Sequence, residues 1–315
     1  MTSKLEVKGL CRSFGEFKVL DHISFTLPSG AVYGFVGPNG AGKTTCLRIL
    51  AGIDDADAGS ILIDGKDLTC YPEILRKRTG LMPDTLPDLS DMTTWEYLDF
   101  VGRAFGKNAE QRKKDMERVC TLTDVERMLD QKLNTLSKGM KQQVSLARIL
   151  LSDADILLLD EPAAGLDPKA RIELRRTLAT IAAEGKTILV SSHILSELED
   201  MVSGIVLLEK GKIFYAGSLE QIAMEKEAET CIQVLITLQN DAEKYLEQFK
   251  AFRFFSTAVI HSPKQILATL TPGTAFNTAM HALFALDLPI SGVFRHDLGL
   301  EGIFINATEK GENRK

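Results

Sequence analysis

The sequence predicts an α/β fold in which a parallel sheet with crossover helices is followed by a smaller α+β domain. Three observations carry this prediction. Short apolar strands alternate with helices over residues 1–222, a charged stretch at residues 223–229 interrupts that pattern, and a new order of strands and helices fills residues 230–315. The chain has 315 residues, of which 44% are hydrophobic and 25% charged, enough for one large and one small globular domain.

The first strands are predicted from alternation between apolar and polar residues. Such a pattern surrounds Val7 and recurs over residues 19–27. Residues 31–36 are mostly apolar, which predicts a buried strand, and this run ends on a glycine-rich turn. Residues 46–50 then predict a helix. The beginning of the chain therefore shows a strand, a glycine-rich turn and a helix in succession.

The middle of the chain predicts a helical subdomain over about residues 85–152. Apolar side chains recur at spacings of three and four between residues 95 and 105, and a second helix is expected over residues 138–151. Residues 156–159 and 187–190 are short, leucine-rich or β-branched runs flanked by helices. This alternation is typical of a parallel sheet with helical crossovers.

The last part of the chain predicts a domain of the split βαβ, or ferredoxin-like, type. The charged stretch at residues 223–229 is interpreted as a linker or hinge helix. After it the expected order is β-α-β-β-α-β, with strands at residues 231–238, 254–260, 266–270 and 289–294 and helices at residues 241–252 and 275–286. The domain boundaries are therefore predicted at 1–222, 223–229 and 230–315.

Composition and charge exclude several classes of protein. The net charge is −6 and no basic lobe is present, so nucleic acid is not an expected partner. No apolar run reaches the roughly 18 residues of a membrane span, and the beginning of the chain does not resemble a secretory signal, so a cytosolic protein is expected. The five cysteines are far apart and form no CxxC pair, which disfavours a disulfide framework or a zinc site.

The most specific motif is GPNGAGKT, which fits G-x-x-x-x-G-K-[ST] after a predicted strand and before a predicted helix. Its residues are Gly37, Pro38, Asn39, Gly40, Ala41, Gly42, Lys43 and Thr44. In such a loop, backbone N–H groups and the helix N-terminus attract phosphate, the lysine reaches the β- and γ-phosphates, and the threonine hydroxyl contacts Mg²⁺. The motif predicts a P-loop NTPase fold that binds a nucleotide together with Mg²⁺.

Two adjacent carboxylates end the predicted strand at residues 156–159. Asp160 and Glu161 point to opposite sides because successive strand residues alternate. At the carboxyl end of a parallel strand, Asp160 suits Mg²⁺ through a water molecule, and Glu161 can polarise a water that attacks the γ-phosphate. Two solvated charges would be the alternative interpretation, but the P-loop favours the catalytic one.

A second anion site is predicted at residues 136–143, which read LSKGMKQQ. Ser137 begins a helix as its N-cap, and Gly139 leaves the backbone bare in the first turn. Taken alone, this pattern is ordinary helix capping. Its position shortly before Glu161 favours a role in binding the nucleotide.

Five motifs together resemble those of the ATP-binding cassette (ABC) ATPases in order and approximate spacing. They are the P-loop, LSKGMKQQ, ILLLDEP at residues 156–162, AGLD at residues 164–167 and SSH at residues 191–193. The resemblance covers residues 3–220. It implies an ABC cassette with a helical subdomain that binds ATP and Mg²⁺ and hydrolyses ATP.

The resemblance also implies roles for individual residues. Phe14 matches the aromatic residue that stacks on adenine, a position usually held by tyrosine, and Thr45 would contact the α-phosphate. Ser137 and Gly139 would bind the γ-phosphate of the nucleotide held by the other subunit, and Asp167 would lie across the dimer interface.

At the reaction centre, the resemblance implies that His193 hydrogen-bonds the γ-phosphate and that Glu161 makes the site competent for hydrolysis with Lys43. One position departs from the family. Asp84 stands where the family has a glutamine that contacts Mg²⁺, with Asp88 as a competing alignment, and the shorter aspartate puts direct metal contact in doubt.

The implied assembly is a homodimer of cassettes that drives separate integral membrane permease subunits from the inner face of the membrane. The ending at residues 295–305, with Leu300, Glu301 and Phe304, is similar to that of type 2 ABC exporters of the drug-resistance class, so we expect an exporter of drugs, antibiotics, lipids or similar compounds. The alternative is a soluble ABC ATPase acting on a nucleic-acid or ribosome complex. Such relatives carry tandem cassettes or long heptad insertions, which this sequence lacks.

Four further side chains are expected to have no part in catalysis. His261, His281 and His296 lie in the second predicted domain without metal-ligand spacing. Cys46 follows the P-loop directly and is interpreted as a packed residue, although its oxidation could disturb ATP binding.

Overall fold

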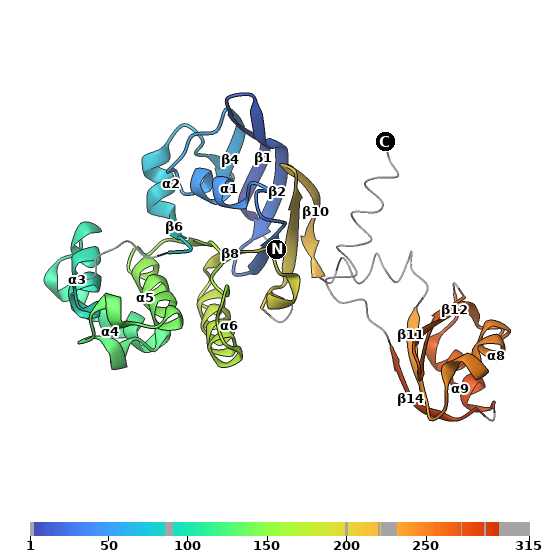
Figure 1. Ribbon diagram of the computed structural model, residues 1–315. Coiled ribbons are helices and arrows are strands. Elements are labelled where there is room, and N and C mark those ends of the chain that lie inside the picture. The colour runs from blue at the N-terminus through green and yellow to red at the C-terminus, as the bar shows by residue number, and fades with distance from the viewer. Residues whose placement is uncertain are drawn as a thin grey trace. The chain divides into compact units, whose positions relative to one another are not determined.

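The computed structural model describes residues 3–85, 91–198, 201–219, 221, 232–271, 273–286 and 288–295. These residues form two compact units, the first built on Met1–Leu219 and the second lying within Glu220–Ile303 (Figure 1). Within the described ranges, no helix combines the length and apolar character needed to cross a membrane.

Several sequence predictions fall outside this part of the chain. They concern the linker at residues 223–229, Asp88, His296 and the exporter-like ending beyond residue 295. The domain boundaries expected from the sequence likewise stay a prediction.

A six-stranded sheet forms the centre of the first unit, in the order β10-β9-β3-β8-β7-β6. Neighbouring strands are parallel except for β10, which is antiparallel to β9. The strands are β3 (Val32–Val36), β6 (Thr79–Met82), β7 (Ile156–Leu159), β8 (Thr187–Ser192), β9 (Gly204–Glu209) and β10 (Lys212–Ser218). All residues of β3, β7 and β8 are buried, as expected for strands covered on both faces, and the strands predicted from the three apolar runs are confirmed.

An antiparallel sheet in the order β2-β1-β4-β5 completes the strand structure of this unit. Its members are β1 (Ser3–Phe14), β2 (Phe17–Pro28), β4 (Ala58–Ile63) and β5 (Lys66–Asp67). Buried and exposed residues alternate along much of β2, which agrees with the predicted period of two. One hydrophobic core joins the buried face of this sheet to the central sheet and to the helix that follows the P-loop.

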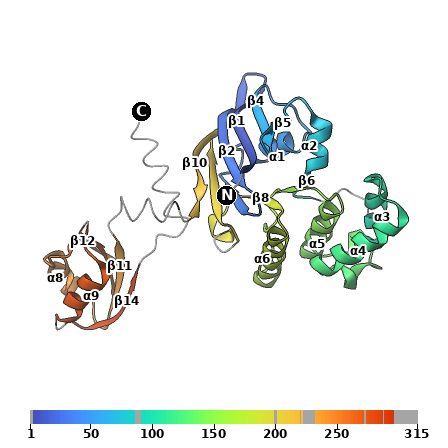
Figure 2. The ribbon, with the colours of Figure 1, turned by 180° about the vertical axis from the view of Figure 1, so that it is seen from behind.

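The helices of the first unit are α1 (Lys43–Leu50), α2 (Pro72–Arg78), α3 (Thr94–Ala104), α4 (Ala109–Thr123), α5 (Lys138–Leu150) and α6 (Pro168–Ala183). Short 3₁₀ segments lie at Glu126–Met128, Leu133–Thr135 and Leu195–Glu197. Helices α3, α4 and α5 gather to one side of the unit, apart from the antiparallel sheet (Figure 2). Capping boxes at Thr93 and Asn108 define where α3 and α4 begin.

The second unit has the predicted β-α-β-β-α-β order. It comprises β11 (Gln233–Leu238), η4 (Ala242–Lys244), α8 (Leu246–Lys250), β12 (Phe255–Ser262), β13 (Gln265–Leu270), α9 (Phe276–Phe284) and β14 (Ile290–Arg295). The four strands form one antiparallel sheet in the order β12-β13-β11-β14. This unit has a core of its own that includes Phe249 and Leu283.

The first helix of the second unit is shorter than predicted. The sequence indicates one helix over residues 241–252, but the structure divides it into η4 and α8. The division falls at Tyr245, whose φ of −114° departs from the helical value. Apolar spacing predicts which face is buried, and Ala242 and Phe249 are buried, but spacing does not register a local change in backbone angle.

Candidate active site

The P-loop joins β3 to α1, and its glycines meet three separate steric demands. A side chain at Gly37 would place its Cβ 2.0 Å from the carbonyl oxygen of Leu208 in β9. Gly40 and Gly42 have φ angles of 79° and 108°, in the region that favours glycine. Gly42 is also the N-cap of α1, so this backbone angle determines how the loop enters the helix.

Lys43, the first residue of α1, places a cation inside this loop. Its side chain is only 6% exposed. The Nζ atom donates hydrogen bonds to the carbonyl oxygens of Gly37 at 2.7 Å and Pro38 at 3.3 Å. It also lies 3.4 Å from Oε1 of Glu161. The loop thus surrounds an ammonium group of the kind that binds phosphate oxygens.

Asp160 follows β7 and accepts hydrogen bonds from two hydroxyl groups. Thr44 Oγ1 donates to Oδ2 at 2.7 Å, and Ser191 Oγ donates to Oδ1 at 2.7 Å. Asp160 is buried, at 6% exposed. A buried carboxylate beside a hydroxyl supplies the hard oxygen ligands that Mg²⁺ prefers, so these residues fit the ion.

Glu161 turns away from Asp160 through an unusual backbone angle. Its φ is 49°, in the left-handed region that costs a non-glycine residue about 1–3 kcal/mol. Its N–H group donates to Ser191 Oγ at 2.9 Å, which holds the turn in place. Its Oε2 atom lies 2.9 Å from Nδ1 of His193, while Oε1 faces Lys43. A carboxylate between an imidazole and an ammonium group is suited to orienting and deprotonating a water molecule.

Parallel pairing brings these groups together from distant parts of the sequence. Val36 of β3 pairs with Ser192 of β8, and Leu159 of β7 pairs with Val190 of β8. The residues that follow β3, β7 and β8 therefore meet at one edge of the sheet. Ligands bind at this edge in open α/β sheets.

The remaining motif residues gather at a second place, between α5 and α6. Ser137 caps α5 by accepting from Met140 N at 3.3 Å, and Asp167 caps α6 by accepting from Ala170 N at 2.9 Å. Together with Gly139 these residues line a pocket of about 440 Å³. The predicted site residues therefore form two groups, one around the P-loop and one in this pocket.

The three other predicted site residues lie on β1, on α1 and beyond the end of β6. Phe14, at the end of β1, is 53% exposed, and the guanidinium of Arg12 lies 4.9 Å from the centroid of its ring. Thr45 is half-buried in the first turn of α1. Asp84 is exposed, two residues beyond the end of β6.

Sequence reasoning missed three residues that support the site. Ser191 contacts both Asp160 and Glu161, and although it belongs to the SSH motif, sequence reasoning gave it no role in the site. Gln142 lines the second pocket with a buried amide that has no hydrogen-bond partner within the described ranges. Arg148 of α5 donates to the carbonyl oxygen of Leu81 in β6 at 2.5 Å, and burial lowers its pKa.

The residues expected to have no part in catalysis lie as follows. Cys46 is completely buried, and burial raises the pKa of its thiol, so it behaves as a packed and unreactive side chain. His261 and His281 lie in the second unit, on β12 and α9.

Comparisons with known proteins agree with this geometry. Residues 20–164 match a family model described as ABC transporter. The chain is 31% identical over 311 residues to a Nod factor export ATP-binding protein I of Ralstonia nicotianae, covering 98% of this chain and 94% of that protein. It is 34% identical over 213 residues to the ABC transporter ATP-binding protein NatA of Bacillus subtilis, covering 67% and 87%.

Among solved structures, the chain is similar to one described as the ATP binding subunit of an ABC transporter. The two share 30% sequence identity with a TM-score of 0.63, and the likeness covers 70% of this chain and 92% of that one. The family-model match includes the P-loop, both strand-end carboxylates and the first turn of α5.

Proposed function

This chain belongs to the ABC transporter family as an ATP-hydrolysing subunit of export type, and from that premise we propose that two copies close around two Mg²⁺–ATP molecules to drive a separate membrane permease. The observation that carries the proposal is the cluster at the sheet edge. There the P-loop with its buried lysine lies beside a carboxylate that accepts from two hydroxyl groups and a second carboxylate that is paired with an imidazole. Phosphoryl transfer requires positioning and charge stabilisation, which these groups supply.

In the proposed mechanism, the residues at the nucleotide site have separate tasks. Lys43 exchanges its bonds to loop carbonyls for bonds to the β- and γ-phosphate oxygens. Thr44 and Asp160 are the residues we assign to Mg²⁺, with Asp84 as the third. When bound, Mg²⁺ neutralises charge that develops on the phosphate oxygens.

Glu161 is the proposed general base. It accepts a proton from the attacking water through the carboxylate that now faces Lys43 and His193. Nδ1 of His193 contacts Glu161, which leaves Nε2 for the γ-phosphate.

The second group of residues is proposed to act on the other subunit's nucleotide. Ser137 and Gly139 present a helix N-terminus, which favours an anion such as the γ-phosphate. Asp167 caps the neighbouring helix beside the same pocket. Closure of two copies would complete each site with residues from both chains, and loss of the γ-phosphate charge would loosen the pair.

We propose an exporter because the family relatives include proteins named for Nod factor export. The work of ATP hydrolysis would pass to integral membrane subunits, which would hold this chain at the inner face of the membrane. We propose drugs, antibiotics or lipids as the transported compounds, because the sequence at residues 295–305 resembles the ending of type 2 ABC exporters.

The test is affinity purification of the chain from detergent-solubilised native membranes, with Lys43→Ala as the matched variant. A polytopic membrane protein that co-purifies with both forms, together with ATPase activity only in the wild-type complex, supports the proposal. Recovery of the chain only outside the membrane, with ribosomes or DNA-bound proteins, overturns the transport role and leaves the ATPase intact.

A further inference from the structure

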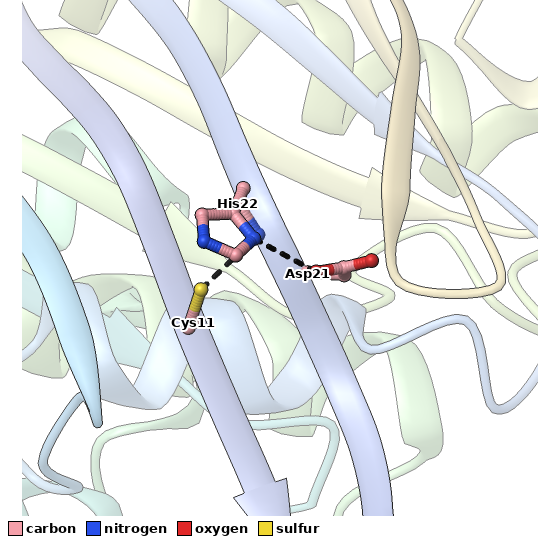
Figure 3. Close-up of side chains that lie close together, drawn as sticks. All are labelled: Cys11, Asp21 and His22. Atoms are coloured by element: carbon pink, nitrogen blue, oxygen red, sulfur yellow. Dashed lines mark hydrogen bonds and ion pairs between the residues drawn. The ribbon is translucent and has the colours of Figure 1, made fainter.

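A β-bulge between β1 and β2 gathers a thiol, a carboxylate and an imidazole. Between two pairs of the register, β1 contributes one residue, Cys11, while β2 contributes two, Asp21 and His22. This two-against-one count defines a bulge, and bulges change the direction of side chains. Strand neighbours normally point to opposite faces, but here both β2 residues lie beside Cys11 (Figure 3).

The ligand-forming atoms of the three side chains are close together. The cysteine sulfur, one carboxylate oxygen and one ring nitrogen all lie within 4.8 Å of one another. Nδ1 of His22 is 2.8 Å from Oδ1 of Asp21, and the backbone N–H of His22 donates to Sγ of Cys11 at 3.3 Å. Sγ of Cys11 also donates to the carbonyl oxygen of Gly9 at 3.6 Å, and binding of a metal would release this proton, because the thiolate is the form that binds metals.

We propose that Cys11, Asp21 and His22 bind a transition metal ion of the zinc class, at a site separate from the nucleotide. Thiolate, imidazole and carboxylate are the three ligand types of protein-bound Zn²⁺, at about 2.0–2.3 Å from the metal. Three protein ligands leave a fourth position for water. Because the set includes sulfur and nitrogen, it selects Zn²⁺ and its neighbours over Mg²⁺.

The side chains have the freedom to close around such an ion. Tetrahedral ligands lie about 3.3–3.7 Å apart at those bond lengths, so atoms up to 4.8 Å apart must approach slightly. The side chain of His22 is 71% exposed and that of Asp21 is 24% exposed, so rotation of these two suffices. Cys11 stays in the sheet as the fixed ligand, and the exposed imidazole leaves a path of entry.

Charge at the site is balanced by two lysines. Lys18 Nζ lies 2.6 Å from Oδ1 of Asp21, and Lys212 Nζ lies 3.4 Å from Oδ2. Both ammonium groups are exposed, with side chains 47% and 65% accessible. A divalent ion displaces Lys18 from Oδ1, and the thiolate and carboxylate together then neutralise the ion.

His22 also adopts a left-handed backbone, with a φ of 52°. Glycine would meet this angle with less strain, and strained non-glycine residues often mark functional sites. The same strand lies against the P-loop, because a Cβ at Gly42 would be 2.9 Å from the carbonyl oxygen of Val19. Metal binding would therefore stabilise β2 where this strand packs against the P-loop.

The test is a cobalt titration of the full-length, nucleotide-free chain after removal of metals with a chelator. We expect one Co²⁺ per chain with a thiolate-to-metal charge-transfer band, and displacement by Zn²⁺. Cys11→Ser should abolish the band, and His22→Asn, which tolerates the left-handed angle, should weaken binding roughly tenfold or more. Cys70→Ser replaces an exposed cysteine and should leave the titration unchanged.

Two results would overturn the proposal. One is the absence of a charge-transfer band in the wild-type chain, or a band that is lost in Cys70→Ser. The other is release of Co²⁺ by Mg²⁺–ATP, which would assign the binding to the P-loop group. Circular dichroism checks the fold of each variant, and His22→Asn decides the outcome if Cys11→Ser does not fold.

Discussion

At the scale of single residues, Glu161 combines a side chain that the motif predicts with a backbone angle that the motif does not predict. Its identity and its place after an apolar run predict a catalytic carboxylate, but nothing in the letters predicts a φ of 49°. The angle results from two interactions in the fold, the N–H bond to Ser191 and the pairing with His193. The chemistry of the carboxylate can be predicted from the motif. The contact that orients Glu161 comes from Ser191 in a strand thirty residues later, so the motif alone does not predict it.

Glu161→Gln tests the assignment of the base. Glutamine keeps the size of the side chain but cannot accept a proton, so we expect ATP turnover to fall roughly 10²- to 10⁴-fold. ATP should still bind, and the unhydrolysed nucleotide should hold two chains together. Size-exclusion chromatography with light scattering in ATP measures this, with the exposed Glu184→Gln as a control that stays active. A monomer in ATP would contradict the proposed role in dimer closure.

Phe14→Ala tests the adenine platform. The exposed ring at the end of β1 is free to stack on a base, with Arg12 beside it. Loss of one aromatic stacking contact should weaken ATP binding about two- to tenfold, with little change in turnover at saturating ATP. Calorimetry of nucleotide binding measures it, and Phe105→Ala, an exposed ring in the helical part, is the control. Equal affinity in wild type and Phe14→Ala would mean that adenine binds elsewhere.

At the scale of elements, most strands follow directly from the apolar runs, and the differences arise from non-local contacts. The predicted helix at residues 46–50 begins earlier, at Lys43, because the last residues of the P-loop already form its first turn. The bulge in β2 depends on its register with β1, which no local pattern encodes. The spacing of cysteines along the sequence reveals zinc sites built from cysteine pairs. It does not reveal a cluster of one cysteine, one aspartate and one histidine such as Cys11, Asp21 and His22.

Asp99 links α3 to α4, which makes it an informative position for the stability of the helical part. Its Oδ1 accepts from Arg112 Nε at 2.7 Å and its Oδ2 from Arg103 Nε at 2.7 Å. Burial acts to raise the pKa of this carboxyl, but the bonds to Arg112 and Arg103 outweigh it and lower the pKa below the ordinary 3.8. The folded chain therefore takes up this proton less readily than the unfolded chain.

Asp99→Asn should lower the free energy of unfolding by about 1–3 kcal/mol at neutral pH, because Arg112 loses a charged partner. The stabilisation by Asp99 is complete above pH 3.8 and is lost as the pH falls through the lowered folded-state value. The difference between variant and wild type should therefore shrink in acid. Urea unfolding followed by fluorescence of Trp95, the single tryptophan and a residue of α3, measures it.

The matched control for this experiment is Asp130→Asn, an exposed aspartate of the same helical part. It should change the unfolding free energy by no more than about 0.5 kcal/mol at any pH. If Asp99→Asn stays as destabilising in acid as at neutral pH, then the ionised carboxylate is not the source of the stabilisation.

At the scale of the whole molecule, the two units have separate hydrophobic cores. The core that surrounds the P-loop uses residues between Leu5 and Leu208, whereas that of the second unit uses residues between Val234 and Leu283. The two sets share no member. The sequence predicts a domain boundary at the charged stretch, because the order of strands and helices changes after it.

We therefore expect that a chain ending at residue 222 folds and binds ATP with an affinity within about twofold of the full-length chain, because every core residue of the first unit in the described ranges lies before residue 222. The fragment 230–315 should also fold, but with a lower thermal midpoint, since a domain of this size buries a smaller fraction of its surface. Nucleotide calorimetry and thermal unfolding of both fragments measure these outcomes. Aggregation of the chain that ends at residue 222, or loss of its ATP binding, would show that the cassette needs residues beyond 222 to fold. The predicted domain boundary would then be wrong.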